Sequence, residues 1–239
     1  MDRRLTHVFF DVTHTLLDVR GSVGEIYARC AARHGLQVEP GSVERSFQEA
    51  IAGIPQPVAP GLAEAEIQAR ERGWWHEVAR RSLAPFGPFP DFEAFFAEVF
   101  EAFRHRDAWV LLPGVAEALR LFRTRGLRLG IISDIDSRLF DVLAAFGLEA
   151  TFDVVCLSFR CGYQKPDVRL FHAALGLAGV PAAQAAHVGD SLRSDVQGAL
   201  GAGMHAIHLD TTRDGGAPSG AHVVHRWSDL PALLERLGR

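Results

Sequence analysis

The amino-acid sequence predicts an α/β protein with a doubly wound parallel sheet at its core and an inserted helical domain. From about residue 112 onwards, short apolar runs alternate with segments of helical periodicity, which is typical of strand–helix–strand units. Another apolar run ends at Asp11, and residues 19–107, which contain no convincing strand, separate it from the alternating part. The first strand therefore belongs to the sheet, and the helical segment is an insertion into it.

The first predicted strand is the apolar run at residues 8–10, which stops at Asp11 and is followed by a small polar turn. Such a run is typical of a buried parallel strand. Ligands of open α/β sheets bind at the carboxyl ends of the strands. Asp11 is therefore a candidate site residue, although aspartate also commonly serves in turns.

The inserted segment is predicted to be helical throughout. Apolar residues recur at helical spacing over 21–35, 42–53, 62–84 and 91–103, and the proline-rich stretch 54–61 is predicted as a loop. Arg20 is a candidate contact for an anionic substrate, but a solvated side chain is the favoured interpretation. Six aromatic side chains are predicted as core of this segment rather than as a substrate wall: Trp74, Trp75, Phe95, Phe96, Phe100 and Phe103.

The remaining chain alternates between predicted strands and helices. The strands are expected at 127–132, 154–157, 185–188 and 205–209, with an edge strand at 222–224. The helices are expected at 113–125, 137–146, 167–175, 195–202 and 230–237, and residues 210–221 are expected to form a loop. Because the carboxyl ends of parallel strands share one edge of the sheet, the residues that follow these strands are predicted to converge.

Composition narrows the class of protein. The chain has 239 residues, 48% hydrophobic and 23% charged, and a net charge of -4, which is ordinary for a soluble domain and gives no nucleic-acid footprint. No apolar run approaches the roughly 18 residues that a membrane span needs, and no signal peptide is recognisable. Cys30, Cys156 and Cys161 cannot all pair and lack zinc-binding spacing, so the sequence favours a reducing, cytoplasmic location.

Polar residues follow four of the predicted strands in order. They are Asp11 with Thr15, Ser133 with Asp134, Lys165, and Asp190 with Asp195. Carboxylates, a hydroxyl and a lysine gathered at one sheet edge suit a carboxylate nucleophile that attacks an anionic substrate beside a divalent cation. An oxygen-rich ligand set favours Mg²⁺, and Ser133 with the backbone N–H of Asp134 would hold the substrate oxygens.

The segments DVTHTLL, IISD, GYQKPD and HVGDSLRSDVQGALGAGM resemble the four ordered motifs of the haloacid dehalogenase (HAD) superfamily. The resemblance spans residues 6–210 and places 19–107 where that superfamily carries its type-1 cap domain. It implies a core domain of residues 1–18 and 108–239 and a helical cap domain of residues 19–107. More narrowly, the segments GEIY, WW and RGLRL are similar to the haloacid dehalogenase-like hydrolase domain-containing protein 3 group.

The resemblance also implies roles for single residues. Asp11 matches the aspartyl nucleophile and Thr15 the residue that steadies it. Ser133 matches the phosphate binder of the second motif, and Lys165 the lysine of the third. The metal ligands are then Asp11, Asp190 and the backbone carbonyl of Thr13, with Asp195 supporting the metal site.

One position departs from the HAD phosphatases, which carry a second Asp two residues after the nucleophile as acid and base. Thr13 stands there, and losing such a group typically lowers the rate 10² to 10⁴-fold. His14 titrates in a suitable range, but a shift of one residue should direct its side chain away from the nucleophile. Asp134, where Asn or Thr is common, would add negative charge unless it points outward.

Three functions are consistent with this pattern. The favoured one is a Mg²⁺-dependent phosphatase that hydrolyses a small phosphomonoester through an aspartyl-phosphate, with weak or narrow activity because of Thr13. A 2-haloacid dehalogenase also lacks the second acid, but typically has neutral residues at the position of Asp190. The third is a catalytically weak protein that binds a phosphorylated ligand or a protein. Phosphonoacetaldehyde hydrolases are excluded, because they need a cap lysine and Lys165 is the only lysine.

Structural roles compete for several of these residues. Asp195 is also a candidate N-cap of the helix that follows it, and Thr15 is a candidate turn residue. His187 and His205 lie inside predicted strands without ligand spacing, so packing roles are favoured for both.

Overall fold

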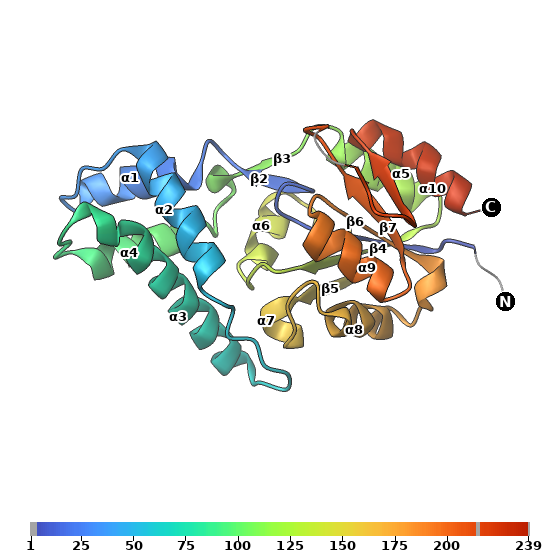
Figure 1. Ribbon diagram of the computed structural model, residues 1–239, viewed down its shortest axis with the longest axis horizontal. Coiled ribbons are helices and arrows are strands. Elements are labelled where there is room, and N and C mark those ends of the chain that lie inside the picture. The colour runs from blue at the N-terminus through green and yellow to red at the C-terminus, as the bar shows by residue number, and fades with distance from the viewer. Residues whose placement is uncertain (1–3, 214–215, 239) are drawn as a thin grey trace.

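The computed structural model describes residues 4–213 and 216–238, and its core is a six-stranded parallel sheet (Figure 1). Residues 1–3 of the predicted core domain and 214–215 of the predicted loop lie outside the described residues. The strand order is β5-β4-β1-β6-β7-β8. The strands are β1 (His7–Phe10), β4 (Arg128–Ser133), β5 (Val154–Leu157), β6 (Ala185–Gly189), β7 (His205–Leu209) and β8 (Ala221–Val224). The prediction of a parallel α/β sheet is confirmed.

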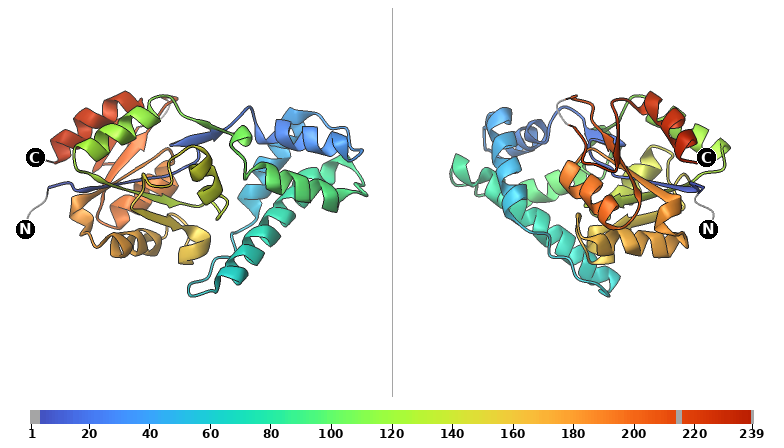
Figure 2. Two further views of the ribbon diagram at one scale, coloured as in Figure 1. Left: turned by 180° about the vertical axis from the view of Figure 1, so that it is seen from behind. Right: turned by 45° about the vertical axis from the view of Figure 1, so that its right-hand side comes forward.

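Helices cover both faces of the sheet. Side chains of β1 alternate between two apolar clusters, with Val8 and Phe10 on one face and Phe9 on the other. The first cluster includes α5 (Val115–Thr124), α6 (Leu139–Ala145) and α10 (Leu230–Leu237). The second includes α8 (Val168–Ala178), the π-helix η4 (Leu192–Gln197) and α9 (Gly198–Gly201). Helices α5 and α10 lie side by side in both views of Figure 2.

The helix predicted at 195–202 begins earlier than expected, because the wider π-helical turn of η4 already starts at Leu192. The shorter elements, which the sequence did not predict, are α7 (Ser158–Cys161), η1 (Ala84–Phe86), η2 (Arg106–Ala108), η3 (Ala182–Gln184) and η5 (Trp227–Asp229).

A two-stranded antiparallel ribbon joins the sheet to the inserted helices. It pairs β2 (Leu17–Val19) with β3 (Trp109–Leu111), so the chain leaves and returns side by side. The backbone N–H of Arg20 extends the pairing by donating to the carbonyl of Ala108 at 2.8 Å. The expectation that residues 19–107 contain no strand is therefore wrong at its first residue. Strands of three residues are too short to show an alternating pattern.

The four predicted helices of the insertion are confirmed. They are α1 (Val23–Arg33), α2 (Pro40–Gly53), α3 (Glu64–Leu83) and α4 (Phe92–Ala102), and they lie beyond the carboxyl ends of the sheet strands (Figure 1). Their shared core is aromatic, because the ring of Tyr27 packs edge-on against Phe47 and Phe95 at centroid distances of 5.7 Å. A Cβ at Gly24 would lie 2.1 Å from the carbonyl oxygen of Pro40, so only glycine lets α1 approach α2 this closely.

Two of the three cysteines are paired in this fold. Cys156 on β5 and Cys161 on α7 form a disulfide, while Cys30 is a free, buried cysteine of α1. The sequence excluded pairing of all three but left this pair open. Across residues 4–213 and 216–238, no helix combines the length and apolar character needed to cross a membrane.

Candidate active site

The site forms where β1, β4 and β6 end. Asp11 follows β1 directly, and its backbone N–H donates to the carbonyl of Val188 on the neighbouring strand β6 at 2.9 Å. The chain then turns tightly, because the N–H groups of three consecutive residues, Thr15 to Leu17, all approach the carbonyl of Val12. This turn fixes the backbone around Asp11, whose side chain is almost fully buried.

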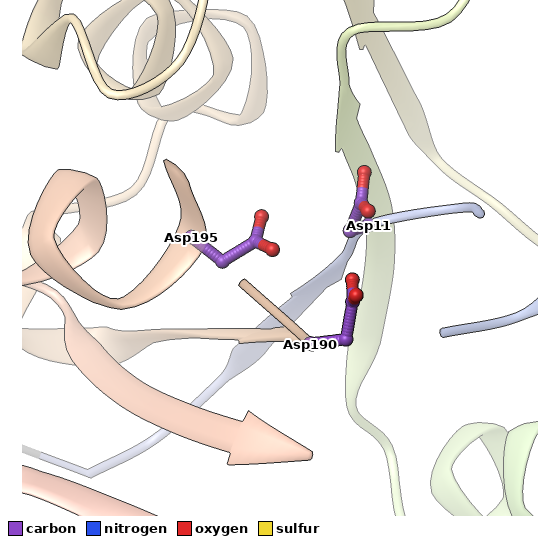
Figure 3. A group of neighbouring side chains, drawn as sticks. All are labelled: Asp11, Asp190 and Asp195. Carbon is purple, nitrogen blue, oxygen red and sulfur yellow. The ribbon is translucent and has the colours of Figure 1, made fainter. Parts of the chain in front are cut away.

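Three carboxylates gather at this edge of the sheet (Figure 3). One oxygen each of Asp11, Asp190 and Asp195 lies within 4.8 Å of the others. Burial, together with the negative charges of Asp11 and Asp195, raises the pKa of Asp190 to about 6. The three acids therefore repel one another unless a cation or a proton lies between them.

Lys165 neutralises part of this charge. Its ammonium donates to Asp11 Oδ1 at 2.7 Å and to Asp195 Oδ1 at 2.6 Å, and its side chain is 4% exposed. Burial alone would lower the pKa of Lys165, but the surrounding carboxylates hold it above its usual range. Lys165 therefore stays charged at neutral pH and leaves Oδ2 of Asp11 without a hydrogen-bond partner among the described residues.

Asp195 is held by three donors. Besides Lys165, Oδ1 accepts a bond from His187 Nε2 at 2.9 Å, and Oδ2 accepts one from the backbone N–H of Ser191 at 3.1 Å. Burial would raise the pKa of Asp195, but Lys165 and His187 together hold it well below its usual range. Asp195 is not an N-cap, since Ser191 fills that role for η4.

His187 is a site residue that sequence reasoning missed. It was expected to serve packing alone, yet its side chain is fully buried against Asp195. His187 and Gly189 are two positions apart on β6, so they face the same side of the sheet. A Cβ at Gly189 would lie 2.2 Å from Asp195 Cγ, which places Asp195 directly over this face of the strand. The available signal was a histidine inside an otherwise apolar strand, two residues before the Gly189 that ends the strand.

His208 on β7 is a second missed contact, because its Nε2 donates to the backbone carbonyl of Asp190 at 2.9 Å. His205, at the start of β7, does not line the cavity, and its packing role stays a prediction.

Ser133 and Asp134 end β4 beside the carboxylates. Ser133 is 3% exposed, and both residues line the same cavity as Asp11. Asp134 does not point away from the site, because its Oδ1 accepts a bond from the backbone N–H of Lys165 at 3.1 Å. Burial raises the pKa of Asp134 to about 7, although Lys165 opposes the shift. The added negative charge at this position is therefore only partly developed at neutral pH.

The three residues after Val12 differ in their surroundings. Thr13 lines the cavity, and no described residue donates to or accepts from its side chain. His14 adopts a left-handed backbone conformation with φ of 59°, and its exposed ring pairs with Asp18 at 3.2 Å rather than with Asp11. The Thr15 hydroxyl reaches Asp190 Oδ1 at 3.5 Å, so its contact is with Asp190 and not with the carboxylate it was expected to steady.

The chain carries the signature of a known family over most of its length. The family model of the haloacid dehalogenase-like hydrolases matches residues 5–203. The human haloacid dehalogenase-like hydrolase domain-containing protein 3 is 38% identical over 202 residues, which cover 83% of this chain and 79% of that protein. The chain belongs to the haloacid dehalogenase-like hydrolases. It is therefore a hydrolase, and the resemblance predicted from its four motifs is confirmed.

Other relatives of this hydrolase differ in their named activities. A phosphoserine phosphatase of Thermus thermophilus is 37% identical over 153 residues, covering 63% of this chain and 59% of that enzyme. Among solved structures, a HAD phosphatase from Thermococcus onnurineus matches with a TM-score of 0.66 and 22% identity, over 96% of this chain and 98% of that one. A 2-haloacid dehalogenase from Pseudomonas syringae matches with a TM-score of 0.67 and 24% identity, over 97% and 99%. These structural matches show the shared fold.

The carboxylates of this hydrolase fit a hard divalent cation. All side-chain donors of the cluster are oxygens, which suits Mg²⁺. Burial and the charges of Asp11 and Asp195 together raise the pKa of Asp190, and a cation between the carboxylates would offset their repulsion. Asp195 already accepts three hydrogen bonds. A carboxylate has roughly four lone-pair sites, so about one remains to bind a metal ion directly or through a metal-bound water. Asp11 and Asp190 are the better-placed direct ligands.

A cavity of about 540 Å³ opens from the carboxylates toward the inserted helices. Gln56, in the loop before α3, bridges to the sheet domain: its Nε2 donates to the carbonyl of Asp134 at 2.8 Å, and its Oε1 accepts from Ser158 Oγ at 2.6 Å. The sequence placed Gln56 in a loop and assigned it no role. Arg20 does not line the cavity, because it donates to the carbonyls of Asp107 and Trp109.

The aromatic prediction holds for one part of the inserted helices. Phe95 and Phe96 are buried core residues, as expected. Trp74 is a buried core residue too, and Trp75 and Phe103 pack against the core. These three side chains also line the cavity, which the sequence did not indicate. Aromatic residues at helical spacing give the same sequence pattern whether they pack against another helix or line a cavity.

Proposed function

We propose that this hydrolase is a Mg²⁺-dependent phosphatase that hydrolyses a small phosphomonoester through an aspartyl-phosphate on Asp11. The observation that carries the proposal is the pairing of Asp11 with Lys165 at 2.7 Å beside a retained acid, Asp190. Lys165 and a cation offset the negative charge of the nucleophile and of an incoming phosphate. The phosphoserine phosphatase among the relatives supports the same activity.

In the first step, Oδ2 of Asp11 attacks phosphorus and the bond from phosphorus to the ester oxygen breaks. The electron pair of that bond leaves with the ester oxygen, which must gain a proton to depart as an alcohol. In this proposal Lys165, the Ser133 hydroxyl and the backbone N–H of Asp134 hold the phosphoryl oxygens, which their position in the cavity lining supports. In the second step, water attacks phosphorus, and Asp11 is released as a carboxylate with inorganic phosphate.

The chain supplies no strong acid at position 13 for either step. The hydroxyl of Thr13 cannot exchange protons efficiently near neutral pH, and the His14 ring pairs with Asp18. We expect the rate to lie about 10² to 10⁴-fold below that of a phosphatase with an acid at this position. The second step suffers most, because water has to be deprotonated there without a base.

The proposed metal ligands are Asp11, Asp190 and the backbone carbonyl of Thr13, with Asp195 supporting the site. When bound, Mg²⁺ supplies positive charge to the phosphoryl oxygens. The residues of the chain do the rest: Lys165 and His187 hold Asp195 in place, and His208 holds the backbone of Asp190.

The division of the chain into a core domain of residues 1–18 and 108–239 and a cap of residues 19–107 is part of the proposal. The β2–β3 ribbon supports it, because it carries both chain crossings between the two parts. A phosphorylated small molecule is the proposed ligand, with no nucleic acid as a partner. A cytoplasmic location stays a prediction, and the Cys156–Cys161 pair removes the cysteine argument for it.

A 2-haloacid dehalogenase is the second candidate, favoured by Thr13, since those enzymes also lack the second acid. In that reaction Asp11 would attack carbon, and halide would leave with the bonding electrons. The retained carboxylate of Asp190 argues against it, because such a reaction has no use for a metal. A binder of phosphorylated ligands is the third candidate, and the same Thr13 favours it.

The test is a panel of phosphomonoesters assayed for phosphate release with and without Mg²⁺. Wild-type protein is compared with Asp11→Asn and Thr13→Asp. Metal-dependent turnover that Asp11→Asn abolishes supports the phosphatase. Turnover by Thr13→Asp alone means that the natural protein is a binder with an otherwise complete site. If neither protein releases phosphate, chloride release from 2-chloropropionate tests the dehalogenase.

A further inference from the structure

The cavity has an aromatic wall on the side of the inserted helices. Its residues come from α1, α2, α3, the end of α4 and β3: Tyr27, Phe47, Trp74, Trp75, Phe103 and Trp109. The rings support one another, since Tyr27 meets Phe47 and Phe103 edge-on and Trp75 lies parallel to Phe47. One cavity thus joins the carboxylates to a preformed apolar surface.

Within residues 4–213 and 216–238, no unpaired lysine or arginine faces this wall. Lys165 and Arg138 are the only lysine and arginine among the described residues that line the cavity. Lys165 is paired with Asp11 and Asp195. Arg138 donates to both carboxylate oxygens of Asp136, at 2.8 and 2.7 Å, and to the carbonyl of Phe100 at 2.8 Å. A carboxylate or a second phosphate on the ligand would therefore lose water without gaining a cation.

A cationic ligand group is also disfavoured. The guanidinium of Arg138 lies 5.2 Å from the ring centre of Trp75, so it already uses this ring and repels a second cation. The acids on this side already have partners: Asp136 pairs with Arg138 and Asp18 with His14. Both carboxylate oxygens of Glu44 accept hydrogen bonds, one from the Gly24 N–H and one from Gln48. The wall therefore suits an uncharged group.

We propose that the phosphomonoester bound here has an uncharged leaving group with a flat aromatic ring, which lies against this aromatic wall at the rings of Tyr27, Phe47, Trp75 and Phe103. This inference rests on the proposed phosphatase function and deepens it. Aromatic rings gain energy from edge-on and offset contacts beyond their buried area. The cavity of about 540 Å³ is large enough for such a molecule, since small-molecule sites span roughly 300–1,000 Å³.

Tyr27 adds one polar contact to the wall. Among the residues that the structure describes, none forms a hydrogen bond with its hydroxyl. Burial raises the pKa of Tyr27 well above its usual range, so the hydroxyl keeps its proton. It is available to donate to an oxygen on the ring of the ligand.

The test is calorimetric titration of wild-type protein, in the presence of Mg²⁺, with four non-hydrolysable probes. Benzylphosphonate carries a neutral ring, phosphonoacetate an added carboxylate, and 2-aminoethylphosphonate an added ammonium; inorganic phosphate is the reference. We expect benzylphosphonate to bind at least about tenfold more tightly than phosphate, with both charged probes no tighter than phosphate. Tightest binding by either charged probe overturns the inference.

A matched pair of variants locates the ring. Phe103→Leu removes a ring from the wall and is expected to lower the preference for benzylphosphonate over phosphate about tenfold. Phe140→Leu removes an exposed ring on α6 that does not line the cavity, and should leave this preference unchanged. Equal effects of the two substitutions would contradict the assignment of the wall.

The two proposals fail in different ways. If the ring is preferred in binding but benzyl phosphate is not hydrolysed, the phosphatase proposal fails and the ligand class stands. If phosphoglycolate or phosphoethanolamine is hydrolysed better than benzyl phosphate, the ligand class fails and the phosphatase stands. If no probe binds, inorganic phosphate included, both are refuted.

Discussion

Replacing His187 with leucine tests whether this buried histidine positions Asp195 or merely fills space. The substitution removes the donor that holds Asp195 Oδ1 at 2.9 Å. A hydrogen bond to a charged group contributes about 1.5–3 kcal/mol. His187 Nδ1 is buried without a partner, and removing such an atom returns about 1–3 kcal/mol. The two effects nearly cancel, so we expect the free energy of unfolding to change by less than about 1 kcal/mol.

The effect on Mg²⁺ binding should be much larger than the effect on stability. With His187 replaced, only Lys165 and the Ser191 N–H hold Asp195, so its carboxylate is freer to turn away from the metal site. Loss of such a supporting contact typically lowers metal affinity 10- to 100-fold. Urea denaturation measures the first quantity, and calorimetric titration with Mg²⁺ measures the second.

Two further variants sharpen this experiment. His187→Gln retains an N–H near the position of Nε2 and should restore most of the Mg²⁺ affinity. His172→Leu alters an exposed histidine of α8 and should change neither quantity. The reasoning is refuted if His187→Leu binds Mg²⁺ as wild-type protein does while losing more than about 3 kcal/mol of stability, because a packing residue behaves in that way.

Three more substitutions test other parts of the site. Burial raises the pKa of Asp134 to about 7, so its negative charge grows as the pH rises from 6 to 8 and repels bound phosphate. Phosphate affinity should therefore fall more over this range in wild-type protein than in Asp134→Asn. An equal fall in affinity for the two proteins would disprove this. In Gly189→Ala the added Cβ would lie 2.2 Å from Asp195 Cγ, so the free energy of unfolding measured with urea should fall by about 1–3 kcal/mol. The control Gly176→Ala, whose Cβ would meet no atom within 4 Å, should not lower it. Equal stabilities of the two variants would be inconsistent with this geometry. Gln56→Ala removes two hydrogen bonds that together contribute about 2 kcal/mol. Limited proteolysis of the loop at 54–63 should therefore accelerate about 30-fold. An unchanged cleavage rate would mean that Gln56 does not hold the loop.

The sheet and the ends of its strands could be predicted from the sequence for a simple physical reason. Strands buried on both faces are continuous apolar runs, and a polar residue at the end of each run marks the carboxyl edge. That is how Asp11, Lys165 and Asp195, which lie far apart in the chain, were expected to meet. Their ion pairs at 2.6 and 2.7 Å follow from this topology.

The contacts that surround these residues leave no such mark. The Gln56 bonds to Asp134 and Ser158 join positions 78 and 102 residues apart, and nothing in a proline-rich loop indicates them. His187 was assigned to packing because a lone polar residue in a strand has no partner visible in sequence. The aromatic wall has the same helical spacing as a closed core, and only the relative placement of the helices distinguishes the two.

The most direct measurement is intact-protein mass spectrometry of wild-type protein mixed with 4-nitrophenyl phosphate and Mg²⁺. This ester needs no acid for its departure, so Asp11 should be phosphorylated, and Thr13 should leave the second step slow. We predict a mass increase of one phosphoryl group that accumulates in wild-type protein, is absent from Asp11→Asn, and is smaller in Thr13→Asp because that variant turns over faster. An unmodified wild-type protein that also releases no phosphate would contradict the assignment of Asp11 as a phosphoryl acceptor.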